Sequence, residues 1–188
     1  GKTRMTSQTT PLQRVTRWKD DVETMLKRHG LEESVEIYQV LAQIHTESRG
    51  WERPEDHLPD GAKDYSAEGL LQMQPIAAED AGLSVGQIDG KGDPYGDALR
   101  SINAWGLLQR RYTGQNAPFW DYPLLWLGGS GTLSRAREYR KTLDYWGAWK
   151  RAADETVVGS GYLTEYAWTF YHAAVAYYQW QMGKRVAQ

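Results

Sequence analysis

Glu47 is the residue of this sequence whose position best suits acid–base chemistry. It follows Ile44 by three residues, at the end of a segment whose apolar side chains recur at helical spacing, so we expect it beside a buried stripe. A polar loop comes next and can fold back over the carboxyl group. Partial burial would keep that carboxyl protonated near neutral pH, as a general acid for a glycosidic oxygen requires.

Two short segments around Glu47 carry a resemblance to a known family. They are residues 44–50, IHTESRG, and residues 66–78, SAEGLLQMQPIAA. Together they resemble the leading motifs of the family-1 soluble lytic transglycosylases, and goose-type lysozymes share much of the pattern. Downstream, residues 125–131, LWLGGSG, are similar to a later glycine-containing motif in which Trp126 stands where the family has tyrosine.

The resemblance implies a lysozyme-like fold and a catalytic role for a single carboxylate, Glu47. Glu47 would protonate the oxygen between N-acetylmuramic acid and N-acetylglucosamine. It would then act as base on the muramic 6-hydroxyl, which closes a 1,6-anhydro ring. The residues that the resemblance places on the substrate are Ser48, Gln72, Met73, Trp126 and Tyr166.

Two of these assignments have alternatives in the sequence. Spacing favours Tyr166 as the family's last conserved tyrosine, but the letters around Tyr139 match more closely. The Ser48 hydroxyl could instead bond to the backbone of its own helix, as serines at helix ends do.

Two functional alternatives to a lytic transglycosylase also stay open. A hydrolytic muramidase needs a second carboxylate to position water, and Asp60 or Asp64 could serve or could be turn residues. A non-catalytic wall-binding or scaffold domain could keep the fold, although binding alone needs no buried acid.

Composition excludes several other kinds of site. The 188 residues carry a net charge of −2 and no cysteine, so nucleic acid is not a favoured partner and thiolate chemistry is excluded. The four histidines show no metal-ligand spacing, and no metal or cofactor is expected. We expect a monomer without a membrane span. The resemblance implies peptidoglycan as its partner, in the cell envelope or periplasm or as part of a phage or secretion system.

The pattern of apolar residues, caps and breakers predicts a mainly α, single domain over 1–188, with residues 1–10 as a flexible tail. Thr10 and Pro11 begin a helix that Gly30 ends, and Gly50 ends a second helix that begins near Glu33. A short hairpin could lie within residues 51–74, and residues 113–133 are expected to be irregular. The other expected helices are 75–81, 97–112, 133–153 and 162–182.

Overall fold

The computed structural model describes residues 8–58, 66–156 and 159–187, and helices dominate them. In chain order the helices are α1 (Pro11–Thr16), α2 (Lys19–Arg28), α3 (Ile37–Ser48), η1 (Pro54–Asp56), α4 (Pro75–Asp80), η3 (Val85–Gln87), α5 (Pro94–Leu108), η4 (Gln109–Thr113), α6 (Asp121–Tyr139), α7 (Tyr145–Asp154) and α8 (Gly159–Ala187). The prediction of a mainly α fold is confirmed. Within the described ranges, no helix is both long and apolar enough to cross a bilayer.

The first helix begins as its local signals predict. The Thr10 hydroxyl accepts a hydrogen bond from the Gln13 amide at 3.1 Å, and the Gln13 side chain accepts one from the Thr10 amide at 2.9 Å. This capping box satisfies amides that the first turn cannot pair internally. The expected continuous helix up to Gly30 is wrong, because the chain breaks at Trp18, whose fully buried indole stacks on Tyr95.

The central helix, α3, is shorter than predicted. It begins at Ile37 rather than near Glu33, because Glu36 and Gln39 form a capping box there and the buried Val35 belongs to the preceding turn. The helix ends at Ser48 and is followed by Arg49 in the left-handed conformation (φ 56°, ψ 22°) and by Gly50 with a φ of 85°, so the predicted end before Gly50 is confirmed. A Cβ at Gly50 would lie 2.8 Å from the Arg14 backbone, so glycine is required there for space as well.

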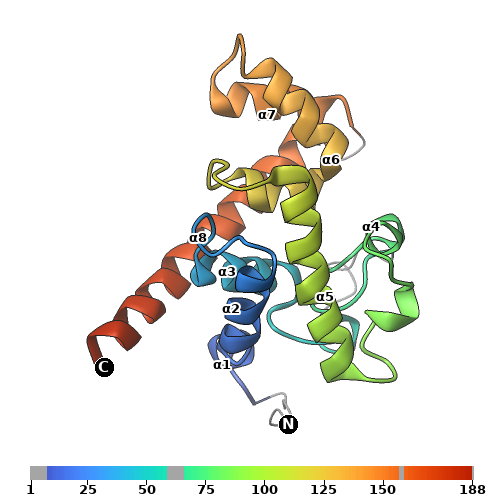
Figure 1. The fold of residues 1–188 in the computed structure, drawn as a ribbon, viewed down its shortest axis with the longest axis vertical. Helices are drawn as coiled ribbons and strands as arrows, with labels where there is room; N and C mark the ends of the chain where they lie inside the picture. Colours follow the sequence, from blue (N-terminus) through green and yellow to red (C-terminus); the bar gives the residue numbers. More distant parts are fainter. Residues whose placement is uncertain (1–7, 59–65, 157–158, 188) are drawn as a thin grey trace.

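Helix α8 runs along much of the molecule and packs most extensively against α3 (Figure 1). The main buried cluster lies between α8 and the helices α1, α2, α3 and α5. A second cluster joins α6 and α7 to the first turns of α8, and a third lies beneath α4. The α3–α8 contact therefore holds Glu47 at the edge of the main core.

The prediction that residues 113–133 are irregular holds for residues 114–120 and is wrong from Asp121 on, since α6 begins there and runs through the glycine-rich segment. Apolar side chains on both sides of the glycines are buried, including Leu124, Leu125 and Leu133, and this packing outweighs the weak helix propensity of glycine. Gly129, with φ of 85° and ψ of 171°, interrupts the helical geometry and kinks α6.

The expected helix over 133–153 is divided in two by a turn between α6 and α7. The Asp144 carboxylate begins α7 by accepting a hydrogen bond from the Gly147 amide at 2.8 Å. At the other end of α6, the fully buried Asp121 accepts two bonds from Arg140, at 3.0 and 3.1 Å, and one from the Tyr145 hydroxyl at 2.6 Å. Arg137 approaches the same carboxylate at 3.4 Å. This ionic cluster ties α6 to α7.

The other expected helices are found with shifted ends. Helix α5 starts at Pro94, three residues before the expected start, and continues into the π-helical turn η4, while α8 is longer than predicted at both ends. The possible hairpin is reduced, in the described residues, to one antiparallel bridge between Glu68 and Met73. At Gly69 a Cβ would lie only 2.0 Å from the Ile88 carbonyl oxygen, so the turn after Glu68 needs glycine.

Candidate functional site

Glu47 lies in the last turn of α3, half-buried, and Tyr166 of α8 lies beside it. The two side chains share a hydrogen bond in which the phenol donates, and Tyr166 is only 7% exposed. Burial raises the pKa of Tyr166 well above its ordinary value, and the nearby Glu47 charge raises it further. Tyr166 therefore stays protonated and can keep donating to the carboxylate.

A buried amide connects this pair to the core. Gln43, one helical turn before Glu47 on α3, donates from Nε2 to the Tyr166 hydroxyl oxygen at 2.7 Å. Its Oε1 accepts from the Trp105 indole Nε1 at 2.9 Å. The sequence argument missed both Gln43 and Trp105. The only available signal was that Gln43 precedes Glu47 by four residues, which places both side chains on one helical face.

Of the two tyrosines that the sequence left open, Tyr166 lies beside Glu47 and Tyr139 does not. Tyr139 lies at the end of α6, where its hydroxyl donates to Glu155 and its ring lies under the Arg151 guanidinium at 4.3 Å. The tertiary contact between α3 and α8 agrees with the spacing argument and not with the local match of letters.

Ser48 takes the backbone role that the sequence had left open. Its hydroxyl donates to the Ile44 carbonyl at 3.1 Å and accepts from the Gly50 amide at 3.2 Å. The residue is 0% exposed, so the expected contact with substrate is not possible in this conformation. Ser48 instead closes the end of the helix that carries Glu47.

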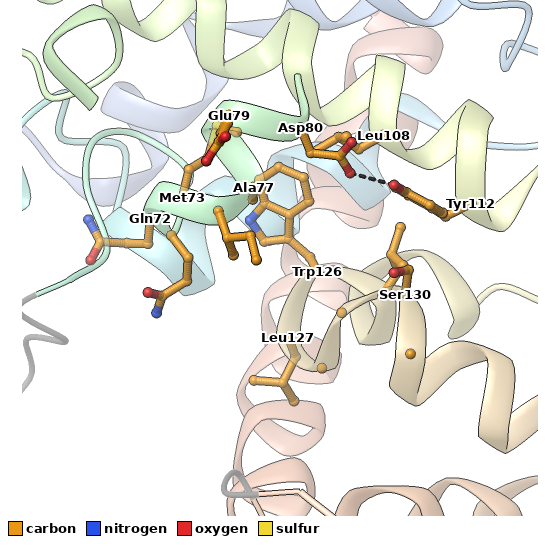
Figure 2. Close-up of a pocket in the computed structure, with 16 residues that line it drawn as sticks. Gln72, Met73, Ala77, Glu79, Asp80, Leu108, Tyr112, Trp126, Leu127 and Ser130 are labelled. Atoms are coloured by element: carbon orange, nitrogen blue, oxygen red, sulfur yellow. Dashed lines mark hydrogen bonds between the residues drawn. The ribbon is translucent and has the colours of Figure 1, made fainter. Parts of the chain in front are cut away.

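Gln72 and Trp126 lie at a separate feature, a cavity of about 920 Å³ between α4, the end of α5 and the kinked α6 (Figure 2). The Gln72 backbone has a positive φ of 50°, and its side-chain amide donates to the Gly69 carbonyl at 3.0 Å. The Trp126 indole donates to the Leu71 carbonyl at 2.7 Å. Both side chains border the cavity, as a contact with substrate would require.

The third expected residue of this region, Met73, is buried and forms part of the cavity wall. It is 1% exposed and packs with Ala78 and Ile88 under α4. On the far side of the cavity the Tyr112 hydroxyl donates to Asp80 at 2.5 Å (Figure 2). The cavity thus has an apolar floor and a polar rim, an arrangement common to ligand sites.

The structure brings the expected site residues together in two groups. Glu47 and Tyr166 form one group, and Gln72, Met73 and Trp126 form the other; Glu47 is not among the described residues that line the cavity. The start of α6 connects them, since the Pro123 carbonyl lies 3.4 Å from Gln43 Nε2 and Trp126 follows one turn later. Asp60 and Asp64 lie outside the described residues.

The histidine nearest the candidate acid is held neutral. Burial, together with the charges of Arg49 and Arg14, lowers the pKa of His45 to about 4, and the ring forms a hydrogen bond with the Tyr177 hydroxyl at 2.8 Å. Among the residues that the structure describes, no cluster of three or more histidine, aspartate or glutamate side chains could hold a metal ion.

Comparisons with models of protein families, with curated proteins and with solved structures give no match to this chain.

Proposed function

We propose that this protein is a peptidoglycan lytic transglycosylase with Glu47 as its general acid and base. The observation that carries the proposal is the half-buried carboxyl group at the end of α3 with the Tyr166 phenol as hydrogen-bond donor. Partial burial favours the protonated carboxyl, and donation from a phenol favours the ionised carboxylate. One group that serves in turn as acid and base needs both forms within reach.

The reaction would proceed in two proton transfers. Protonated Glu47 gives its proton to the glycosidic oxygen between N-acetylmuramic acid and N-acetylglucosamine, and that bond breaks. The resulting carboxylate is stabilised by the Tyr166 hydroxyl. It then removes the proton from the muramic 6-hydroxyl, whose oxygen closes the 1,6-anhydro ring, so that no water is consumed.

The cavity beside Trp126 supports the binding half of the proposal. An aromatic face and the Gln72 amide at its rim suit a sugar with apolar ring faces and polar edges. The proposal requires a glycan strand bound at this cavity to reach Glu47, which lies outside the cavity lining. The setting that fits such a substrate is the cell envelope, or a phage or secretion apparatus that acts on the wall.

Mass spectrometry of muropeptides released from purified wall tests the proposal. The expected products end in 1,6-anhydro-muramic acid and are lighter by one water than hydrolytic products. They should disappear with Glu47→Gln and persist with Glu32→Gln, a control at an exposed acid just before α3.

Two other results would each replace the proposal. Products without the loss of water would identify a hydrolytic muramidase, and Asp60→Asn and Asp64→Asn would then locate its second carboxylate. Binding to wall without any released product would identify a wall-binding domain.

A further inference from the structure

Gln43 is a buried neutral amide whose hydrogen-bonding groups face partners of fixed character. It is 1% exposed, and its partner Trp105 is also 1% exposed. An indole N–H can only donate, so the atom of Gln43 that faces Trp105 Nε1 must be the oxygen. This contact alone sets the orientation of the amide.

The orientation of the amide then sets the direction of the next hydrogen bond. With Oε1 at the indole, Nε2 faces the Tyr166 hydroxyl oxygen at 2.7 Å and the Pro123 carbonyl at 3.4 Å. A flipped amide would place two donors together at Trp105 and two acceptors together at Pro123. Tyr166 therefore accepts from Gln43, and its own hydrogen is directed elsewhere.

We propose that Gln43 is a positioning residue that holds Tyr166 as the hydrogen-bond donor to Glu47. The order of donation runs from Trp105 to Gln43, from Gln43 to Tyr166 and from Tyr166 to Glu47. A phenol that accepts one hydrogen bond also becomes a stronger donor in the next. The role in catalysis rests on the proposed function, whereas the order of the hydrogen bonds does not.

Kinetics of Gln43→Met test the role, because methionine fills a similar volume without these polar groups. We expect kcat to fall roughly tenfold, the effect of one buried hydrogen bond, while KM stays unchanged because Gln43 cannot reach a glycan. Gln109→Met is the matched control. Gln109 is also a fully buried amide, bonded to the Tyr122 carbonyl at 2.7 Å and to Thr113 at 2.6 Å. That variant should lose similar stability and keep its kcat.

A double-mutant cycle separates positioning from general loss of structure. If Gln43 acts through the Tyr166 hydroxyl, the double variant Gln43→Met with Tyr166→Phe should turn over no more slowly than Tyr166→Phe alone. If the wild type is active and the turnover losses of the two single variants multiply in the double variant, the proposal is overturned.

Nuclear magnetic resonance of the side-chain amides tests the order of donation without any substrate, and without requiring Gln43→Met to fold. In Tyr166→Phe, one Gln43 Nε2 proton should lose its hydrogen-bonded shift and exchange faster, while the Trp105 indole proton stays slow to exchange. Unchanged Gln43 amide protons would overturn the proposal. Wild-type protein that shows the expected amide signals but cleaves no wall would reject the proposed function and leave the hydrogen-bond order standing.

Discussion

The carboxylates of Asp121 and Glu47 both lie in polar networks of the interior, and the two networks treat them in opposite ways. Asp121 is completely buried and receives two hydrogen bonds from Arg140, one from Tyr145 and a longer contact from Arg137. Glu47 is only partly buried, and the neutral phenol of Tyr166 donates a hydrogen bond to it.

The difference separates an acid that holds helices together from one that can take part in chemistry. Complete burial keeps Asp121 out of reach of solvent, and its ion pairs with two guanidinium groups make it a fixed part of the α6–α7 contact. A partly exposed carboxyl group, such as that of Glu47, can exchange protons and meet a substrate. The two networks should therefore respond differently to the loss of a single charge.

The largest expected effect is on activity, in Glu47→Gln. Glutamine keeps the size of the side chain but carries no transferable proton, so turnover of wall should fall by about 10²–10⁴-fold or to background. The free energy of unfolding should stay the same or rise, because partial burial of an ionisable carboxyl group costs stability and a neutral amide avoids that cost. Wall-clearing assays and thermal unfolding check the two results. A variant that is inactive and badly destabilised would make Glu47 a structural residue like Asp121.

Asp121→Asn should show the reverse behaviour. It leaves two guanidinium groups without their counter-charge, so the free energy of unfolding should fall by about 3 kcal/mol and Tm by about 6–12 °C. Glu138→Gln, which removes an exposed ion pair between the end of α6 and Lys141 in the turn that follows, should change stability by less than about 1 kcal/mol. Turnover by the folded Asp121 variant should be normal, and a selective loss of kcat would break the comparison.

A smaller effect is expected from acid, through His45. Its pKa is about 4 in the folded protein and 6.5 for the free side chain, so the unfolded chain binds more protons between these values. Stability should therefore fall as the pH falls from 6.5 to about 4, by roughly 2 kcal/mol once solvent screening is allowed for. Unfolding of His45→Asn should lose this part of the pH dependence. An unchanged slope in that variant would mean that another group causes it.

The smallest effect is expected at the cavity, from Gln72. Loss of its amide should lower kcat/KM about fivefold, the size of one hydrogen bond to substrate. Gln72→Gly and Gln72→Ala should lose equal activity. The glycine variant should be the more stable of the two, because the backbone at this position has a positive φ. If the glycine variant is more active than the alanine variant as well as more stable, Gln72 acts only by shaping the turn.

Local signals in the sequence predicted the ends of several helices, and packing decided the rest. Thr10, Pro75 and Gly50 act through their own backbone and nearest neighbours, and the helix ends that they predict are found. The glycine-rich part of α6 was missed because its helicity depends on leucines buried against α7 and α8. Those contacts come from residues far along the chain.

The candidate site was predictable to a similar extent. Glu47 and Gln72 stand in recognisable motifs, and the spacing along the chain favoured Tyr166. Gln43 carries no pattern of its own, since a glutamine on a helix is ordinarily solvated. Its role becomes visible only when α5 and α8 bring Trp105 and Tyr166 to the two ends of one amide.

The kink at Gly129 makes one residue responsible for the direction of the chain beyond the cavity. Its φ of 85° and ψ of 171° belong to a region that other residues enter only at a cost of order 1–3 kcal/mol. Any side chain at this position would favour a straighter α6 and a differently shaped cavity wall. Homologous chains that have lost the kink glycine should therefore differ in the ligands they accept, even where Glu47 and Tyr166 are retained.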